Sequence, residues 1–206
     1  MIIVVMGVCG SGKTTIGCSV AEQLKWQFAD ADEFHSVENK KKMSAGQALT
    51  EQDRLPWLQS IHKYAKRLSQ SNQSGVITCS ALKKIYRDVL RYGTSCKMQC
   101  TAEIKPDTNV DNKCEHLKDS DLNDTHKEGV DVVKEGVDIV FIHLTGSREV
   151  LESRLTNRMG HFMPAEMLQS QLDTLENLES QEKGFTVDIN NTETEITKTI
   201  ISQLNI

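Results

Sequence analysis

The sequence predicts an α/β fold in which a mostly parallel, five-stranded sheet lies between two layers of helices. Short apolar runs alternate along the chain with longer stretches whose apolar residues recur at helical spacing. This alternation is typical of right-handed crossovers between parallel strands. A glycine-rich turn directly follows the first apolar run, where such a sheet has its ligand-binding edge. We expect one domain over residues 1–206, a length that can bury a sizeable core.

The expected strands are apolar or β-branched runs bounded by turn signals, and the expected helices are the amphipathic stretches between them. The strands cover residues 2–6, 26–30, 75–80, 137–146 and 185–189. The helices cover residues 13–24, 50–68, 81–92, a stretch from Arg148, 164–178 and 192–204.

The first half of the chain carries the clearest local signals. The run IIVVM is typical of a buried strand, and the helix after it turns Ala21 and Leu24 inward. Thr50 and Asp53 have the spacing of a capping box, with Asp in place of the usual Glu, at the start of the longest helix. The apolar residues of that helix fall at helical intervals, at Leu55, Leu58, Ile61, Tyr64, Ala65 and Leu68. The strand GVITCS then leads into the helix ALKKIYRDVLRY.

In the second half, a polar interval separates that helix from the strand VDIVFIHLTG. Residues 94–136 contain no aromatic side chain and too little apolar surface to offset the entropy of ordering them. We therefore expect a disordered surface insertion. It ends in a tandem repeat, KEGVDVV then KEGVDIV, which is either a docking motif or a local duplication whose second copy enters the sheet.

Composition excludes some function classes. The net charge of -5 does not fit a nucleic-acid-binding surface, and the apolar runs are too short to span a membrane. Without a basic leader segment, we expect a cytoplasmic protein that acts on a small molecule and binds neither nucleic acid nor membrane. The six cysteines are then expected as free thiols. A zinc site at Cys96, Cys100, Cys114 and His116 is the alternative, but its spacing matches no zinc motif.

The glycine-rich turn matches the pattern G-x-x-x-x-G-K-[ST] between a strand and a helix, the context that a phosphate-binding P-loop requires. Glycines let the backbone turn its N–H groups toward phosphate oxygens at the helix N-terminus. Lys13 is expected to reach the β- and γ-phosphates, and the Thr14 hydroxyl to ligate Mg²⁺. ATP and Mg²⁺ are therefore the expected cofactors. The nucleotide-binding residues are Gly7, Val8, Cys9, Gly10, Ser11, Gly12, Lys13, Thr14 and Thr15.

Two carboxylates follow the second strand in the segment DADEFH. If this segment is extended, Asp30 and Asp32 both point toward the carboxyl edge of the sheet. Paired carboxylates beside a phosphate site suit a Mg²⁺ contact, expected from Asp30, and a base that accepts a hydroxyl proton, expected from Asp32. The alternative is that Asp32 only caps the next helix.

Two basic pairs lie on later helices. Lys83 and Arg87 are four residues apart, as are Arg154 and Arg158. The second pair precedes the break GHFMP and predicts a mobile lid over residues 154–166, with Arg158 as a catalytic arginine and both arginines binding the nucleotide. The alternative is that both pairs are solvated helix faces.

Five segments in order, GVCGSGKTT, DADEFH, LTEQDRLPWL, CSALKKIYRDVLR and GHFMPAEMLQSQLDTLE, resemble the gluconokinase family of small P-loop sugar-acid kinases. The resemblance covers nearly the whole chain outside the insertion, and DRLPWL and CSALKK-x-YRD are far more specific than the P-loop. It implies a P-loop NTPase fold like that of nucleoside monophosphate kinases, and a homodimer. It also implies transfer of the γ-phosphoryl group of ATP to the 6-hydroxyl of D-gluconate, which feeds the pentose phosphate pathway.

Gluconate is an anion with a row of hydroxyls, so its pocket needs a fixed cation and several polar groups. The candidates are Asp32, His35, Arg54, Lys83, Arg87 and His161. Arg54 could instead pair with Asp53 or Glu51, and His161 could be a packed hinge residue. Trp57 is expected in the core.

Three positions depart from the family pattern, Cys9, Ser36 and Leu172, the last of which stands where Phe is usual. The insertion is also longer than is typical of the family. Cys9 stands where serine is usual; phosphate binding should survive because the loop contributes backbone N–H groups, although oxidation of the thiol would block it. Ser36 stands where proline is common, which should loosen the turn after His35.

Two other functions stay open at this stage. One is a P-loop kinase of another small acceptor, either a shikimate-like acid or a nucleoside monophosphate. The other is a non-catalytic nucleotide-binding protein whose insertion recruits a partner. A GTPase is excluded because the chain has neither Asn-Lys-x-Asp nor Asp-x-x-Gly.

Overall fold

The strands form one sheet that is parallel throughout. The computed structural model describes residues 1–94, 136–156 and 165–206. Its strands are β1 (Ile2–Met6), β2 (Gln27–Asp30), β3 (Gly75–Thr78), β4 (Ile139–Thr145) and β5 (Gly184–Asp188). They lie in the order β2-β3-β1-β4-β5, and every neighbouring pair is parallel. The predicted α/β class is confirmed.

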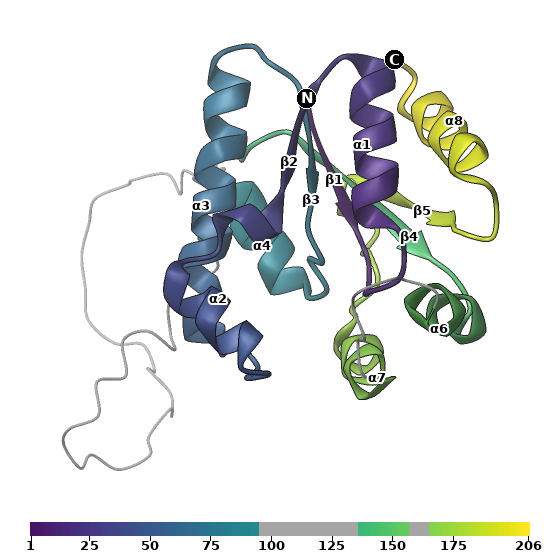
Figure 1. The fold of residues 1–206 in the computed structure, drawn as a ribbon. Helices are drawn as coiled ribbons and strands as arrows, with labels where there is room; N and C mark the ends of the chain where they lie inside the picture. The colour runs from purple at the N-terminus through teal and green to yellow at the C-terminus, as the bar shows by residue number, and fades with distance from the viewer. Residues whose placement is uncertain (95–135, 157–164) are drawn as a thin grey trace, which may run out of the picture.

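Helices cover both faces of this sheet (Figure 1). They are α1 (Lys13–Leu24), the short 3₁₀ helix η1 (Ala31–Phe34), α2 (Val37–Ser44), α3 (Glu51–Gln70), α4 (Lys84–Tyr92), α6 (Arg148–Thr156), α7 (Ala165–Thr174) and α8 (Glu193–Leu204). Helices α3 and α4 pack on one face, and α1 and α8 pack on the other. Figure 1 shows α2, α6 and α7 gathered at the carboxyl end of the sheet.

Strand β1 forms the centre of the core because it is apolar on both sides. Alternate residues of a strand face opposite sides of the sheet. Ile2, Val4 and Met6 accordingly pack against α3 and α4, whereas Ile3 and Val5 pack against α1 and α8. This central position fixes the turn after Met6 at the middle of the carboxyl edge, where open α/β sheets bind ligands.

The predicted capping box at the head of α3 is confirmed. The Thr50 hydroxyl accepts from the Asp53 backbone N–H at 3.2 Å, and the Asp53 carboxylate accepts from the Thr50 backbone N–H at 3.0 Å. The predicted inner stripe of α3 is buried at Leu58, Ile61, Ala65 and Leu68, while Leu55 and Tyr64 are partly buried. The head of α3 is therefore rigid, which matters because it borders the site.

Two helix boundaries were predicted wrongly, and one helix was missed. Helix α4 begins at Lys84 instead of residue 81, because Ala81 has a left-handed φ of 44°, which is incompatible with a right-handed helix. Helix α7 ends at Thr174, short of residue 178. Helix α2 escaped notice since it is almost entirely polar, and contacts with α3 hold it in place: the buried Asn39 side chain donates to the Asp53 carbonyl at 2.9 Å.

Several predicted features lie outside the described residues. These are most of the insertion, most of the lid, the first copy of the repeat and the four residues of the alternative zinc site. From the second copy, Ile139 and Val140 pair with Ile2 and Ile3 of β1. Within the described ranges, no helix is long and apolar enough to cross a membrane.

Candidate active site

The phosphate loop spans the turn from β1 into α1. Gly7, Gly10 and Gly12 all have a positive backbone φ, which residues with a Cβ atom rarely adopt. A Cβ on Gly10 would also lie 2.9 Å from the Leu151 carbonyl oxygen, so the loop is packed against α6. Gly12 is the N-cap of α1, and no side chain among the described residues caps that helix. The first N–H groups of α1 are therefore available to phosphate oxygens.

Lys13 folds back over the loop. Its ammonium donates to the Val8 carbonyl at 2.9 Å, which places the charge beside the first half of the loop. Burial lowers the pKa of Lys13, and the nearby carboxylates of Asp32 and Asp30 oppose that effect. An ammonium that has lost hydration and lies at this loop is suited to bind a phosphate oxygen.

Cys9 is nearly buried in this loop, and its thiol is free, as are those of Cys18 and Cys79. Burial raises the pKa of Cys9, so the thiol is protonated at neutral pH and reacts slowly with oxidants. The predicted sensitivity to oxidation is therefore weaker than an exposed cysteine would give.

The candidate metal site joins α1 to β2. The Thr14 hydroxyl donates to one carboxylate oxygen of Asp30 at 3.1 Å, and the other oxygen accepts from the Asp32 backbone N–H at 3.0 Å. Mg²⁺ binds few protein oxygens and takes its remaining ligands from water and phosphates. A hydroxyl and a carboxylate in contact beside the phosphate loop fit that donor set.

The structure gives Asp32 a different local geometry from the one predicted. The extended stretch ends at Asp30, which caps η1, and Asp32 lies inside that 3₁₀ helix. The alternative capping role for Asp32 is also wrong, since Ser36 caps α2 by accepting from the Asn39 backbone N–H. Ser36 thus stabilises a helix start and does not loosen the turn.

Asp32 still lies near Lys13. Its carboxylate is exposed and accepts no hydrogen bond from a described residue, while its charge acts on Lys13, His35 and Cys79. The structure thus brings an exposed carboxylate without a hydrogen-bond donor among the described residues close to Lys13.

His35 and Trp57 form the floor beside Asp32. Their rings stack with centroids 4.3 Å apart and planes 11° apart. Trp57 is buried in the core, as predicted, and its indole N–H donates to the Ala31 carbonyl at 2.7 Å, so α3 holds η1 in place. Burial lowers the pKa of His35, and its Nδ1 atom is buried without a partner among the described residues. His35 is therefore neutral at pH 7.

The heads of α3 and α4 bring two cations to one aromatic ring. Lys83 lies 5.6 Å and Arg54 lies 5.9 Å from the centre of the Tyr86 ring. The Glu51 carboxylate accepts hydrogen bonds from the Lys83 ammonium at 2.7 Å and from the Tyr86 hydroxyl at 2.8 Å. The positive charge of Lys83 is therefore balanced by Glu51. Burial alone would raise the pKa of Glu51, but these hydrogen bonds outweigh it and lower the pKa.

The side chain of Arg54 forms no hydrogen bond and no ion pair with any residue in the described ranges. The alternative ion pair of Arg54 with Asp53 or Glu51 is wrong, since Asp53 binds Lys42 at 2.7 Å and Glu51 binds Lys83 at 2.7 Å. Hydrogen bonds from Lys42 and Thr50 lower the pKa of Asp53 to about 2. Of the described residues Lys83 and Arg54 beside Tyr86, Arg54 is thus the one whose charge has no carboxylate partner.

The chain is similar to known kinases along nearly its whole length. A probable gluconokinase of Xenopus tropicalis is 40% identical over 92% of this chain and 85% of its own. The chain belongs to the gluconokinase family. A gluconokinase structure from Sinorhizobium meliloti 1021 is 34% identical, covers 98% of this chain and 90% of its own, and has a TM-score of 0.65. A sugar kinase structure from Janibacter sp. HTCC2649 is 38% identical, covers 100% and 94%, and has a TM-score of 0.74. The shikimate kinase family model matches residues 9–103.

This family membership settles the P-loop NTPase fold, and the structure places one of the two lid arginines. A guanidinium nitrogen of Arg154 lies 3.4 Å from where a Cβ on Gly12 would stand, and the side chain donates to the Ile189 carbonyl at 2.6 Å. Arg154 therefore lies against the phosphate loop. Arg158 and His161 lie outside the described residues.

Arg87 does not face the substrate side. Its side chain is fully buried and binds the Glu182 carboxylate twice, at 2.6 and 2.8 Å. It also donates to four backbone carbonyls, those of Ala81, Leu82, Glu176 and Asn177. With its donors used in this way, Arg87 is a structural residue, and the predicted substrate contact is withdrawn.

Replacing Arg87 with methionine should destabilise the protein by about 3–5 kcal/mol, because Glu182 would be left buried and unpaired. The double replacement Arg87→Met with Glu182→Met should recover much of that loss. As a control, Arg148→Met breaks the exposed pair with Glu152 and should cost at most about 1 kcal/mol. Urea unfolding measures all three; a single Arg87→Met variant as stable as wild type would contradict the structural role.

Three residues near the site were not predicted. Glu51 and Tyr86 come from different helices, and their contact spans 35 residues of sequence, so no local pattern indicates it. Gln171 of α7 contacts the phosphate loop across 162 residues. For all three, only the folded chain brings the partners together.

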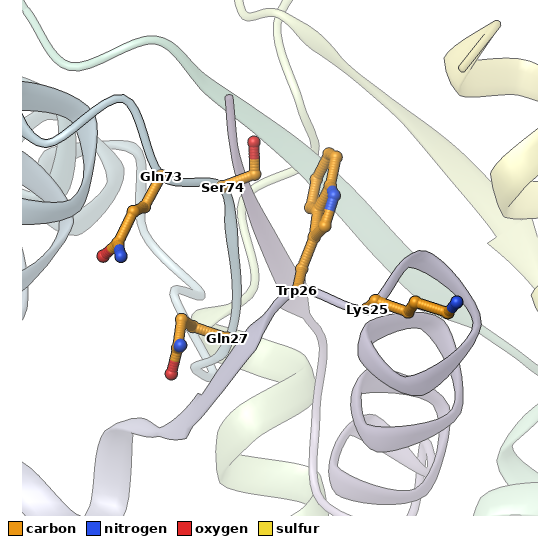
Figure 2. A pocket seen from close by; sticks show the side chains of 5 residues that line it. All are labelled: Lys25, Trp26, Gln27, Gln73 and Ser74. Atoms are coloured by element: carbon orange, nitrogen blue, oxygen red, sulfur yellow. The ribbon is translucent and has the colours of Figure 1, made fainter.

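The pocket in Figure 2 lies away from this site. It is lined by Lys25, Trp26, Gln27, Gln73 and Ser74. These residues lie at the amino ends of β2 and β3, whereas the phosphate loop lies at the carboxyl end of β1. The pocket therefore lies at the opposite edge of the parallel sheet.

Proposed function

We propose that this chain is an ATP-dependent gluconokinase that phosphorylates the 6-hydroxyl of D-gluconate. The observation that carries the proposal is that the Asp32 carboxylate and the Arg54 guanidinium both lie near His35 and are both without an ion-pair partner among the described residues, in a chain of the gluconokinase family. The product, 6-phosphogluconate, fits entry into the pentose phosphate pathway. The dimer and the cytoplasmic location expected from the sequence stay predictions.

The donor side binds the triphosphate. Residues 7–15 form the phosphate site: their backbone N–H groups, apart from those of Gly7, Cys9 and Ser11, which donate to other residues of the chain, and the ammonium of Lys13 hold the phosphates. Arg154 lies at the loop to bind the nucleotide. Thr14 and Asp30 would hold Mg²⁺, and the ion would offset negative charge on the phosphates. Arg158 is proposed to add a further charge to the transferring group.

The acceptor side holds the sugar acid with its reacting end toward the loop. Arg54 binds the carboxylate, while Lys83 and His35 contact hydroxyls along the chain. Asp32 orients the 6-hydroxyl and accepts its proton as a bond forms between that oxygen and the γ-phosphorus. The bond from the γ-phosphorus to the β,γ-bridging oxygen breaks, and ADP leaves with that oxygen.

A coupled ADP-release assay tests the acceptor directly. Turnover should require gluconate and should be absent with shikimate, with nucleoside monophosphates and without an acceptor. Equal turnover with shikimate, or with a nucleoside monophosphate, would replace gluconate as the assigned substrate. ATP binding without turnover on any acceptor would favour the non-catalytic alternative.

Replacing Arg54 with glutamine should raise the KM for gluconate about 10- to 100-fold, because a charge-assisted contact of about 1.5–3 kcal/mol is lost. The KM for ATP should stay near its wild-type value. The matched control is Arg67→Gln, on the same helix, where the guanidinium lies 5.4 Å from the Tyr64 ring. If both variants keep the wild-type KM for gluconate, Arg54 does not bind the carboxylate.

A further inference from the structure

One contact of the phosphate loop is not used by the reaction described above. The backbone N–H of Cys9 donates to the side-chain oxygen of Gln171 at 2.7 Å. Cys9 is nearly buried, so without this acceptor its backbone N–H would be a nearly buried donor with no hydrogen bond. Gln171 lies on α7, which is anchored in the core by the fully buried Leu168.

This contact lies at the γ-phosphate end of the loop. Lys13, whose ammonium serves the β- and γ-phosphates, reaches back to the carbonyl of Val8, the residue before Cys9. The uncapped N–H groups at the start of α1 lie at the other end of the loop, where they are available to the phosphates nearer the nucleoside. Gln171 therefore holds the half of the loop that is nearest the group to be transferred.

The chain directly after Gln171 holds the acceptor side. Glu176 donates its backbone N–H to the Leu82 carbonyl at 2.7 Å and accepts the Lys84 backbone N–H at 2.5 Å. Arg87 donates to the carbonyls of Glu176 and Asn177. The short segment 171–177 thus touches both the phosphate loop and the head of α4, which carries Lys83 and Tyr86.

We propose that Gln171 is a positioning residue that fixes the distance between the γ-phosphoryl group and the acceptor hydroxyl. It acts through the backbone of Cys9 and does not contact the substrate. Phosphoryl transfer depends on alignment, and a misplacement of about 1 Å can lower the rate roughly 10²-fold. Losing the contact should therefore affect the chemical step and leave the grip on the inner phosphates intact.

The test compares two Gln171 variants with a control on the same helix. Gln171→Leu removes the acceptor, and Gln171→Asn keeps the amide but is too short to reach. The control is Gln169→Leu, because Gln169 contacts Arg148 and Asp173 and not the loop. Turnover at saturating ATP and acceptor, ADP affinity by calorimetry, and melting temperature are measured for each protein.

Both Gln171 variants should lose roughly 10- to 100-fold in kcat while ADP affinity stays within about twofold of wild type. Gln169→Leu should match wild type in both quantities. Any other pattern overturns the proposal: an unchanged kcat removes the role, and a joint fall of kcat, ADP affinity and melting temperature makes Gln171 merely structural. This inference depends on the proposed kinase function, but the two can fail separately. If the wild-type protein phosphorylates a different acid, the Gln171 variants are compared with it on that acid, so the role of Gln171 is still tested.

Discussion

Replacing Lys13 with alanine should lower kcat/KM for the reaction of ATP with gluconate roughly 10³-fold. The ammonium lies over the phosphate loop, and no second lysine or arginine in the described ranges contacts the Val8 carbonyl that it occupies. Removing it takes away the charge that stabilises the γ-phosphoryl group as negative charge spreads over its oxygens. ADP binding should weaken less than turnover, because the backbone N–H groups remain.

The matched control for Lys13→Ala is Lys66→Ala, an exposed lysine on α3. It should leave both turnover and ADP binding unchanged. The coupled ADP-release assay measures turnover of both variants, and ADP binding is measured separately. A Lys13→Ala enzyme with more than a tenth of wild-type turnover would contradict the assigned role of this side chain.

Replacing Asp32 with asparagine should lower kcat roughly 10²- to 10⁴-fold, the range expected when a general base is lost. The amide keeps the shape of the side chain but cannot take the proton of the acceptor hydroxyl. The KM for ATP should change little, because Asp32 forms no hydrogen bond to the described residues of the phosphate loop.

Glu33→Gln is the control for Asp32→Asn, because Glu33 is the next residue of η1 and is also exposed. It loses the same charge one position away and should retain wild-type kcat. If Asp32→Asn and Glu33→Gln both turn over at the wild-type rate, Asp32 is not the base. If the kcat of both variants falls equally, the loss comes from the removal of a negative charge near the loop and not from the loss of a base at Asp32.

The parts of the fold that the sequence predicted well are those set by local chemistry. The run Ile2–Met6 is apolar on both faces, and the glycines after it require positive φ, so strand, loop and helix follow from adjacent residues. The capping box at Thr50 is equally local. Family resemblance added the acceptor, which no spacing of charges could have indicated.

The parts that failed depend on contacts between distant segments. Arg87 has the spacing of a surface cation, but Glu182, 95 residues away, folds over it and takes it out of solvent. The polar helix α2 has little apolar periodicity, and its ion pair with Asp53 forms only when α3 is in place. Gln171 belongs to the same class of residue, since its partner lies at the other end of the chain.

The central claim is that gluconate lies between Arg54 and Asp32 with its 6-hydroxyl facing the γ-phosphate. A crystal structure with a non-hydrolysable ATP analogue, Mg²⁺ and gluconate tests it most directly. The account predicts the gluconate carboxylate on Arg54, the 6-oxygen about 3–3.5 Å from the γ-phosphorus and within hydrogen-bond reach of Asp32. Gluconate bound in the reverse direction, or away from the phosphate loop in a closed complex, would contradict it.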